Sequence, residues 1–99
     1  MHFEDTSRTT SLKLLGDFWT LRIIDALADG DIRFCDLQRT IDNCNPVTLT
    51  DRLKKLEEAK LLTRTEASDN CVVYSLTDLG KNALPVIAAI DTFTRKSQA

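Results

Sequence analysis

The chain has 99 residues, which is enough for one packed domain and too few for two independent cores. Hydrophobic residues make up 42% and charged residues 28%, which excludes a disordered chain, and no apolar run approaches the roughly 20 residues of a membrane span. Acidic residues (15) outnumber basic ones (13) for a net charge of −2, so DNA binding would require the cations to gather on one face.

The first part of the chain predicts a short helix followed by a longer, largely buried one. Residues 1–10 are polar, mixed in charge and unlike a secretory signal, so we expect a flexible arm and a cytoplasmic protein. Apolar residues at 11–15 predict the first helix, which Gly16 ends. Asp17 is placed to cap the next helix, at 19–28, where apolar residues recur at helical spacing.

Two further helices are predicted on either side of a tight turn. A very short strand at 32–33 precedes a helix at 34–41. The inward face of this helix consists of Phe34, Leu37 and Ile41. Asn45 is placed as N-cap of a helix at 46–59, and Pro46 fits its first position because no N–H is needed there.

The helix at 46–59 is amphipathic. One narrow arc of its surface carries Leu49, Leu53 and Leu56. The opposite arc carries Val47, Asp51, Lys54, Lys55 and Glu58. We therefore expect one face to pack against the body of the domain and the other to look outward.

The last part of the chain predicts a hairpin and a final helix. Runs rich in Val, Thr, Leu and Tyr at 61–66 and 71–76 predict two strands, with the turn at 67–70. Thr77 caps a helix that reaches about residue 95 and that Pro85 should kink or loosen, leaving a tail at 96–99. The apolar surface of this helix is wider than one neighbour can cover. The structured domain is thus expected at 11–95.

This order of elements predicts a mainly α fold with a small β-hairpin, a winged helix-turn-helix. Such a domain places its second helix, here 46–59, in the major groove, while the hairpin reaches the neighbouring backbone. The predicted contacts in the first turns of that helix are Thr48, Thr50, Asp51 and Arg52. Lys54 and Lys55 suit phosphate, and an arginine at 52 could pair with guanine or hold phosphate. We expect double-stranded DNA as the partner.

The distribution of basic residues supports the prediction of DNA binding, but the amphipathic helix at 46–59 has a second interpretation. Six cations gather between positions 39 and 64: Arg39, Arg52, Lys54, Lys55, Lys60 and Arg64. Any solvated amphipathic helix would also place leucines inward and charges outward. The alternative is therefore a winged-helix module that mediates protein contacts with weak or no DNA binding, which the acidic total charge favours.

Three blocks of sequence give the chain a specific resemblance. They are Leu14-Leu15-Gly16-Asp17-Phe18-Trp19-Thr20-Leu21, then Arg33-Phe34-Cys35-Asp36-Leu37-Gln38 continuing into the helix at 46–59, and Tyr74-Ser75-Leu76-Thr77-Asp78-Leu79-Gly80. Over nearly its whole length, the chain resembles the HxlR-type winged-helix regulators through these blocks. The resemblance implies a homodimer that binds pseudo-palindromic operator DNA and often senses a small molecule: a metabolite, an electrophile or an oxidant.

The resemblance also assigns residues to these roles. Arg52 and Thr50 look like DNA contacts, and Arg33 and Gln38 look like helpers near the DNA backbone. The dimer would be held by the first and last helices, through Leu12, Leu15, Leu84, Ile87, Ile90 and Phe93. The chain departs from the family pattern at Thr6, where members usually carry a cysteine, and at Phe18, which replaces a basic residue.

Other chemistry finds little support in the sequence. No phosphate loop, zinc spacing or nucleophile motif occurs, so we expect no enzyme, no cofactor and no metal. The cysteines Cys35, Cys44 and Cys71 are expected to be reduced and buried as small hydrophobes, with a redox switch as the alternative.

Overall fold

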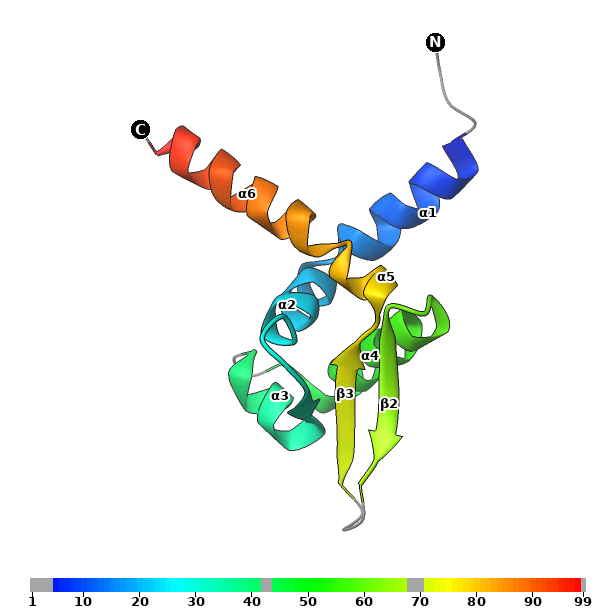
Figure 1. Cartoon of the computed structure of the whole chain (residues 1–99). Coiled ribbons are helices and arrows are strands. Elements are labelled where there is room, and N and C mark those ends of the chain that lie inside the picture. Colours follow the sequence, from blue (N-terminus) through cyan, green and yellow to red (C-terminus); the bar gives the residue numbers. More distant parts are fainter. Residues whose placement is uncertain (1–4, 42–43, 68–70, 99) are drawn as a thin grey trace.

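A computed structural model describes residues 5–41, 44–67 and 71–98. Its elements are α1 (Asp5–Leu15), α2 (Phe18–Ala26), β1 (Ile32–Arg33), α3 (Phe34–Thr40), α4 (Pro46–Glu58), β2 (Leu62–Glu66), β3 (Val72–Leu76), α5 (Asp78–Lys81) and α6 (Leu84–Ser97). The strands form one antiparallel sheet in the order β1-β3-β2. The mainly α winged helix-turn-helix predicted from the sequence is confirmed (Figure 1).

The core lies where α2, α3 and α4 meet the sheet. Fully buried side chains include Ile23 and Ile24 of α2, Leu37 of α3, and the three leucines predicted on α4. Trp19 and Phe34 are partly buried against this cluster. The helical spacing of apolar residues therefore identified the packing faces correctly, because burial of these faces is the main favourable term in folding.

The two ends of the chain differ from the sequence-based expectations. The first helix begins at Asp5, so most of the arm expected at 1–10 is helical. The last helix is two helices, because the chain turns at Asn82 and Ala83 and Pro85 lies in the first turn of α6, where its ring is tolerated. α6 continues to Ser97, into the expected tail.

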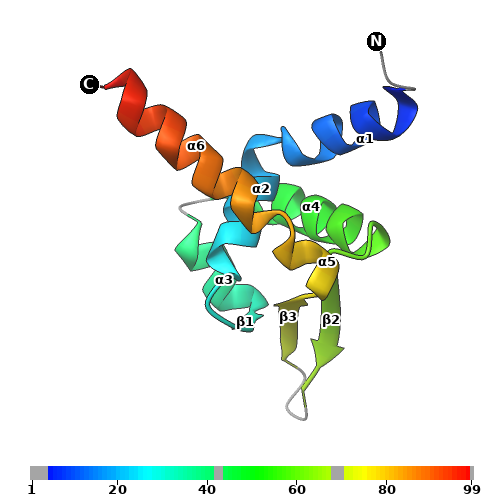
Figure 2. The same cartoon turned by 45° about the horizontal axis from the view of Figure 1, so that its top comes forward.

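α1 and α6 give the molecule an open shape. Figures 1 and 2 show both helices diverging from the body like the arms of a V, on the side away from the hairpin. The radius of gyration is 14.7 Å, whereas a compact chain of this length would have about 12.6 Å. α6 contains no buried residue. Within the described residues, no helix is long and apolar enough to cross a membrane.

The start of α5 is fixed by a close approach to the end of α4. Thr77 Oγ1 donates to the Lys60 carbonyl (2.7 Å) and accepts from the Gly80 N–H (3.0 Å), which confirms the predicted cap. Gly80 lies so close to Leu61 that an added Cβ would be 2.1 Å from the Leu61 carbonyl oxygen. Position 80, in the third sequence block, therefore has room only for glycine, because any larger residue would overlap the Leu61 carbonyl oxygen.

The cysteines do not share one environment. Cys44 is buried, as expected, and burial raises the pKa of its thiol. The expectation of burial is wrong for Cys35, which is exposed at the first turn of α3, and Cys71 is only partly buried beside β3. No group of three or more metal-ligating side chains occurs among the described residues.

Candidate nucleic-acid interface

α3 and α4 form the helix-turn-helix. Asn45 caps α4 by accepting a hydrogen bond from the Val47 N–H (2.7 Å), and Pro46 occupies the first turn. Because Leu49, Leu53 and Leu56 point into the core, the rest of the α4 surface is turned outward. The cap and the leucines together fix which side chains α4 presents.

The outward face of α4 carries most of the predicted contacts. Thr50, Asp51, Lys54 and Lys55 are exposed, and Thr48 is half-buried. Val47 is 77% exposed although it is apolar. Five of the residues on this face line a hollow of about 370 Å³: Pro46, Val47, Thr50, Asp51 and Lys54. The face thus offers hydroxyls, a methyl-bearing side chain and an ammonium group within one contact area.

A second hollow connects α4 with the sheet. Its volume is about 460 Å³, and its walls come from α3, α4 and all three strands or their ends. Arg33, Thr50 and Arg64 are among the residues that line it. Arg33 therefore lies beside the outward face of α4, whereas Gln38, which is half-buried on α3, does not line this hollow. Arg64 was predicted only as one cation of the basic cluster, because its strand position relative to α3 depends on the sheet pairing.

Arg52 has an unexpected environment. Its Nε donates to Asp17 Oδ2 (2.9 Å), and its Nη1 donates to Asp51 Oδ2 (2.6 Å). The side chains of Arg52 and Asp17 are only 26% and 25% exposed. Hydrogen bonding by the guanidinium holds the pKa of both aspartates below the usual range. A side chain predicted to reach DNA is thus tied to the start of α2.

Acidic neighbours also offset other members of the basic cluster. Lys55 Nζ lies 3.4 Å from Asp51, Arg64 Nη1 lies 3.3 Å from Glu66, and Arg39 pairs with Asp36. With Arg52, four of the six clustered cations have a carboxylate partner. The exposed pairs of Arg39, Lys55 and Arg64 each contribute little to stability. Lys54 and Lys60 have no ion pair among the described residues.

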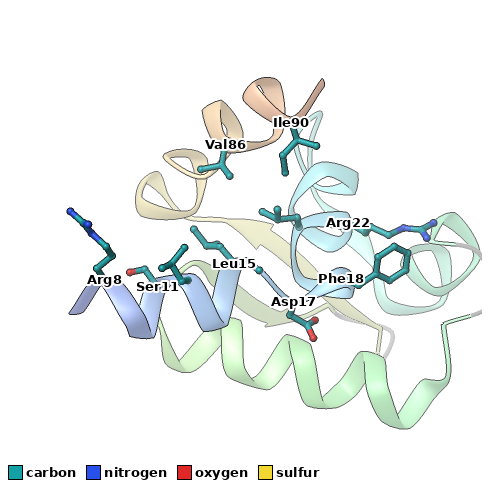
Figure 3. A pocket seen from close by; sticks show the side chains of 11 residues that line it. Arg8, Ser11, Leu15, Asp17, Phe18, Arg22, Val86 and Ile90 are labelled. Carbon is teal, nitrogen blue, oxygen red and sulfur yellow. The ribbon is translucent and has the colours of Figure 1, made fainter. Parts of the chain in front are cut away.

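A separate apolar groove of about 630 Å³ lies between α1, α2 and α6 (Figure 3). Leu12, Leu15, Val86 and Ile90 line it from the two outer helices. Phe18, at its edge, is 64% exposed and lies under the guanidinium of Arg22 at 5.1 Å. An exposed apolar groove of this size on a small domain is typical of an interaction surface.

Of the six residues predicted for dimerisation, Leu12, Leu15 and Ile90 line this groove, and the six divide into two groups by exposure. Leu12, Ile90 and Phe93 are 65%, 47% and 72% exposed. Leu15, Leu84 and Ile87 are half-buried and pack partly against the core of their own chain. Val86 and Phe18 are also exposed and line the groove, although neither was predicted to lie at an interface.

Comparisons with known proteins agree on one family. The HxlR-like helix-turn-helix family matches residues 14–98. An uncharacterized HTH-type transcriptional regulator of Methanothermobacter thermautotrophicus is 31% identical over 78 residues, 77% of this chain and 60% of that protein. The HTH-type transcriptional regulator YodB of Bacillus subtilis is 34% identical over 73 residues, 72% of this chain and 65% of YodB. The chain thus spans less than two thirds of the length of these two relatives.

Solved structures share the fold over nearly the whole chain. A Porphyromonas gingivalis W83 protein, described as a transcriptional regulator of the MarR family, aligns with a TM-score of 0.85 at 31% identity, covering 96% of this chain and 95% of that one. Quinone-bound YodB aligns with a TM-score of 0.80 at 28% identity, covering 91% and 97%.

Proposed function

Because the chain belongs to the HxlR-like helix-turn-helix family, we propose that it regulates transcription in the cytoplasm by binding pseudo-palindromic operator DNA as a homodimer. α4, within the predicted range 46–59, enters the major groove. The wing is short, and residues 68–70 of its predicted tip at 67–70 lie outside the described residues. The observation that carries the proposal is that α4 buries its leucines and offers hydroxyls and cations beside the sheet.

The contacts divide by chemistry. Thr48 and Thr50 can bond to base edges or phosphate, and Val47 can meet a thymine methyl group. Lys54 and Lys55 act as point charges on phosphate, and the carboxylate of Asp51 orients Lys55 (3.4 Å). Arg33, at the end of β1, and Gln38 of α3 are proposed as contacts to the DNA backbone, and Arg33 is favoured by the hollow that it shares with Thr50.

A second copy of the chain is the proposed occupant of the groove between α1, α2 and α6. α6 has no buried residue in the single chain, and an isolated helix of 14 residues is marginally stable in water. Packing against a symmetry-related copy would bury the exposed Leu12, Ile90 and Phe93 on both sides of a two-fold axis. The dimer would also give two recognition helices, as a pseudo-palindrome requires. Control by a small effector completes the proposal, since YodB has been solved with quinone bound.

The test is binding to duplex DNA across a range of salt concentrations, starting with duplexes enriched from a random pool. The double variant K54A/K55A should reduce the slope of log affinity against log salt by about 2, because each lost phosphate contact lowers it by about 1. K81A is the matched control, since Lys81 is exposed on α5 and lies outside the α4 face. Failure to enrich any duplex at low salt would contradict the proposal.

A protein-interaction module is the second candidate. The ion pairs of Arg52, Lys55 and Arg64 favour it, because they offset charge that DNA binding would use. In that case K54A/K55A would bind a protein partner normally while neither it nor the wild type bound DNA. The salt titration therefore separates the two candidates.

A further inference from the structure

One carboxylate oxygen, Oδ2 of Asp17, forms hydrogen bonds with both α2 and α4. Asp17 Oδ2 accepts hydrogen bonds from the N–H groups of Trp19 and Thr20, both at 3.1 Å, and from Thr20 Oγ1 at 3.1 Å. It also accepts the Arg52 Nε–H at 2.9 Å. The same atom therefore caps α2 and holds a side chain of α4.

On the α4 side, this arrangement limits what Arg52 can do. The guanidinium is directed by two carboxylates, Asp17 on Nε and Asp51 on Nη1. Reading a guanine requires two donors of the guanidinium to face O6 and N7 together. Asp17 and Asp51 occupy two of the five N–H groups of Arg52 and set the orientation of its guanidinium, as expected of a side chain that fixes its own helix.

On the other side, Asp17 belongs to the wall of the apolar groove. It lines the groove together with Gly16 and Phe18, and Figure 3 shows its side chain at the junction of α1 and α2. That junction is tight: the Gly16 N–H donates to the Leu12 carbonyl (2.8 Å), and a Cβ on Gly16 would lie 2.6 Å from the same oxygen. Asp17 therefore follows directly on a closely packed turn at the end of α1.

From this geometry we propose that Asp17 and Arg52 are positioning residues that fix α4 relative to the dimer groove and so determine which half-site spacing the dimer accepts. The inference rests on the proposed function. In a two-fold dimer, the separation of the recognition helices depends on how each is held against its own dimerisation surface. Half-sites are expected about one helical turn apart, and a shift of α4 at each copy would change the best spacing.

The variant D17N separates positioning from direct contact. Asparagine caps helices about as well as aspartate, so α2 keeps its N-cap while Arg52 loses its charged partner. If Arg52 were a direct DNA contact, its release from Asp17 would raise affinity at every spacing by more than the loss of one negative charge alone does. If it positions α4, affinity at the best spacing falls about tenfold, and affinity at the wrong spacings stays nearly constant.

The experiment measures affinity for a series of duplexes whose half-sites are set at the best spacing and at one base pair less, one more and two more. D25N is the matched control, because it makes the same charge change at an exposed residue of α2. We expect wild type and D25N to discriminate between spacings, and D17N to lose about tenfold of that discrimination. R52Q should reproduce D17N without lowering the salt slope, and it carries the test if D17N does not fold.

Two results with D17N would overturn the inference alone: D17N discriminating between spacings as sharply as wild type, or D17N binding more tightly than D25N at every spacing. R52Q lowering the salt slope by about 1 would identify Arg52 as a phosphate contact and overturn it as well. Wild-type protein that binds no duplex at all would remove the proposed function and this inference together, so the two failures are distinguishable.

Discussion

Truncating Phe93 to alanine should separate the two copies of the proposed dimer. Phe93 is 72% exposed on α6, and a fully buried phenylalanine removes about 200 Å² from water. About 140 Å² is therefore available to a partner, an upper limit of about 3.5 kcal/mol per copy at ~25 cal/mol per Å². Alanine keeps part of this contact, so we expect about 2 kcal/mol per copy. A two-fold interface contains the contact twice, which gives about 4 kcal/mol, or roughly a thousandfold in the dimer Kd.

The assay is sedimentation across a dilution series without DNA. V47A is the matched control, because Val47 is 77% exposed on α4 and lies outside the groove, so its truncation should leave the dimer Kd unchanged. The helical content of F93A should match that of wild type at concentrations where both are folded. The reasoning is refuted if F93A dimerises as strongly as wild type, or if wild type stays monomeric at every concentration.

Three further predictions concern the single chain. G80A should lower the free energy of unfolding by about 2–3 kcal/mol in urea titrations, because the new Cβ would overlap the Leu61 carbonyl oxygen at 2.1 Å, and an unchanged midpoint would contradict this close approach. Wild type should unfold with a higher free energy than D17N at neutral pH, and this difference should shrink as pH falls below about 4. The pKa of Asp17 is lowered in the folded chain, so its ion pair stabilises the fold above the unfolded value of 3.8 and is lost when the carboxylate is protonated. A difference in unfolding free energy that does not change with pH would contradict this role of Asp17. In an alkylation series followed by peptide mass mapping, the exposed Cys35 should be modified well before Cys44. Cys44 is a buried residue, 2% exposed, and burial raises the pKa of its thiol, so equal rates would contradict the packing.

The parts of the fold that sequence predicted depend on local chemistry. Asp17 and Thr77 cap the helices they were expected to cap, and Asn45-Pro46 begins α4 at the expected position. In each case the signal lies within three residues of its effect. Pro85 predicted a kink or loosening in the last helix, but the sequence carried no comparable signal for the turn at Asn82 and Ala83 that separates α5 from α6.

The parts that sequence missed depend on distant pairs. Asp17 and Arg52 are 35 positions apart, and neither the cap pattern nor the helix pattern indicates that one oxygen serves both. Arg64 approaches Arg33 and Thr50 only because β1 and β2 both pair with β3. The sequence predicted where the cations gather but not the ion pairs of Arg52 and Arg64, because spacing does not show which carboxylates turn toward them.

α2 lies between the two surfaces that the proposed function requires, the groove for the second copy and the outward face of α4. Its middle, at Ile23 and Ile24, is fully buried and cannot shift without opening the core. Its first turn, by contrast, exposes Phe18 to the groove and holds Asp17 against Arg52 of α4. The proposed dimer surface at Phe18 and the proposed DNA-binding face of α4 are therefore connected through a single capped turn that is anchored in the core. Because that turn contacts both surfaces, D17N should affect how the proposed dimer spaces its two α4 helices more than how stably the chain folds at neutral pH.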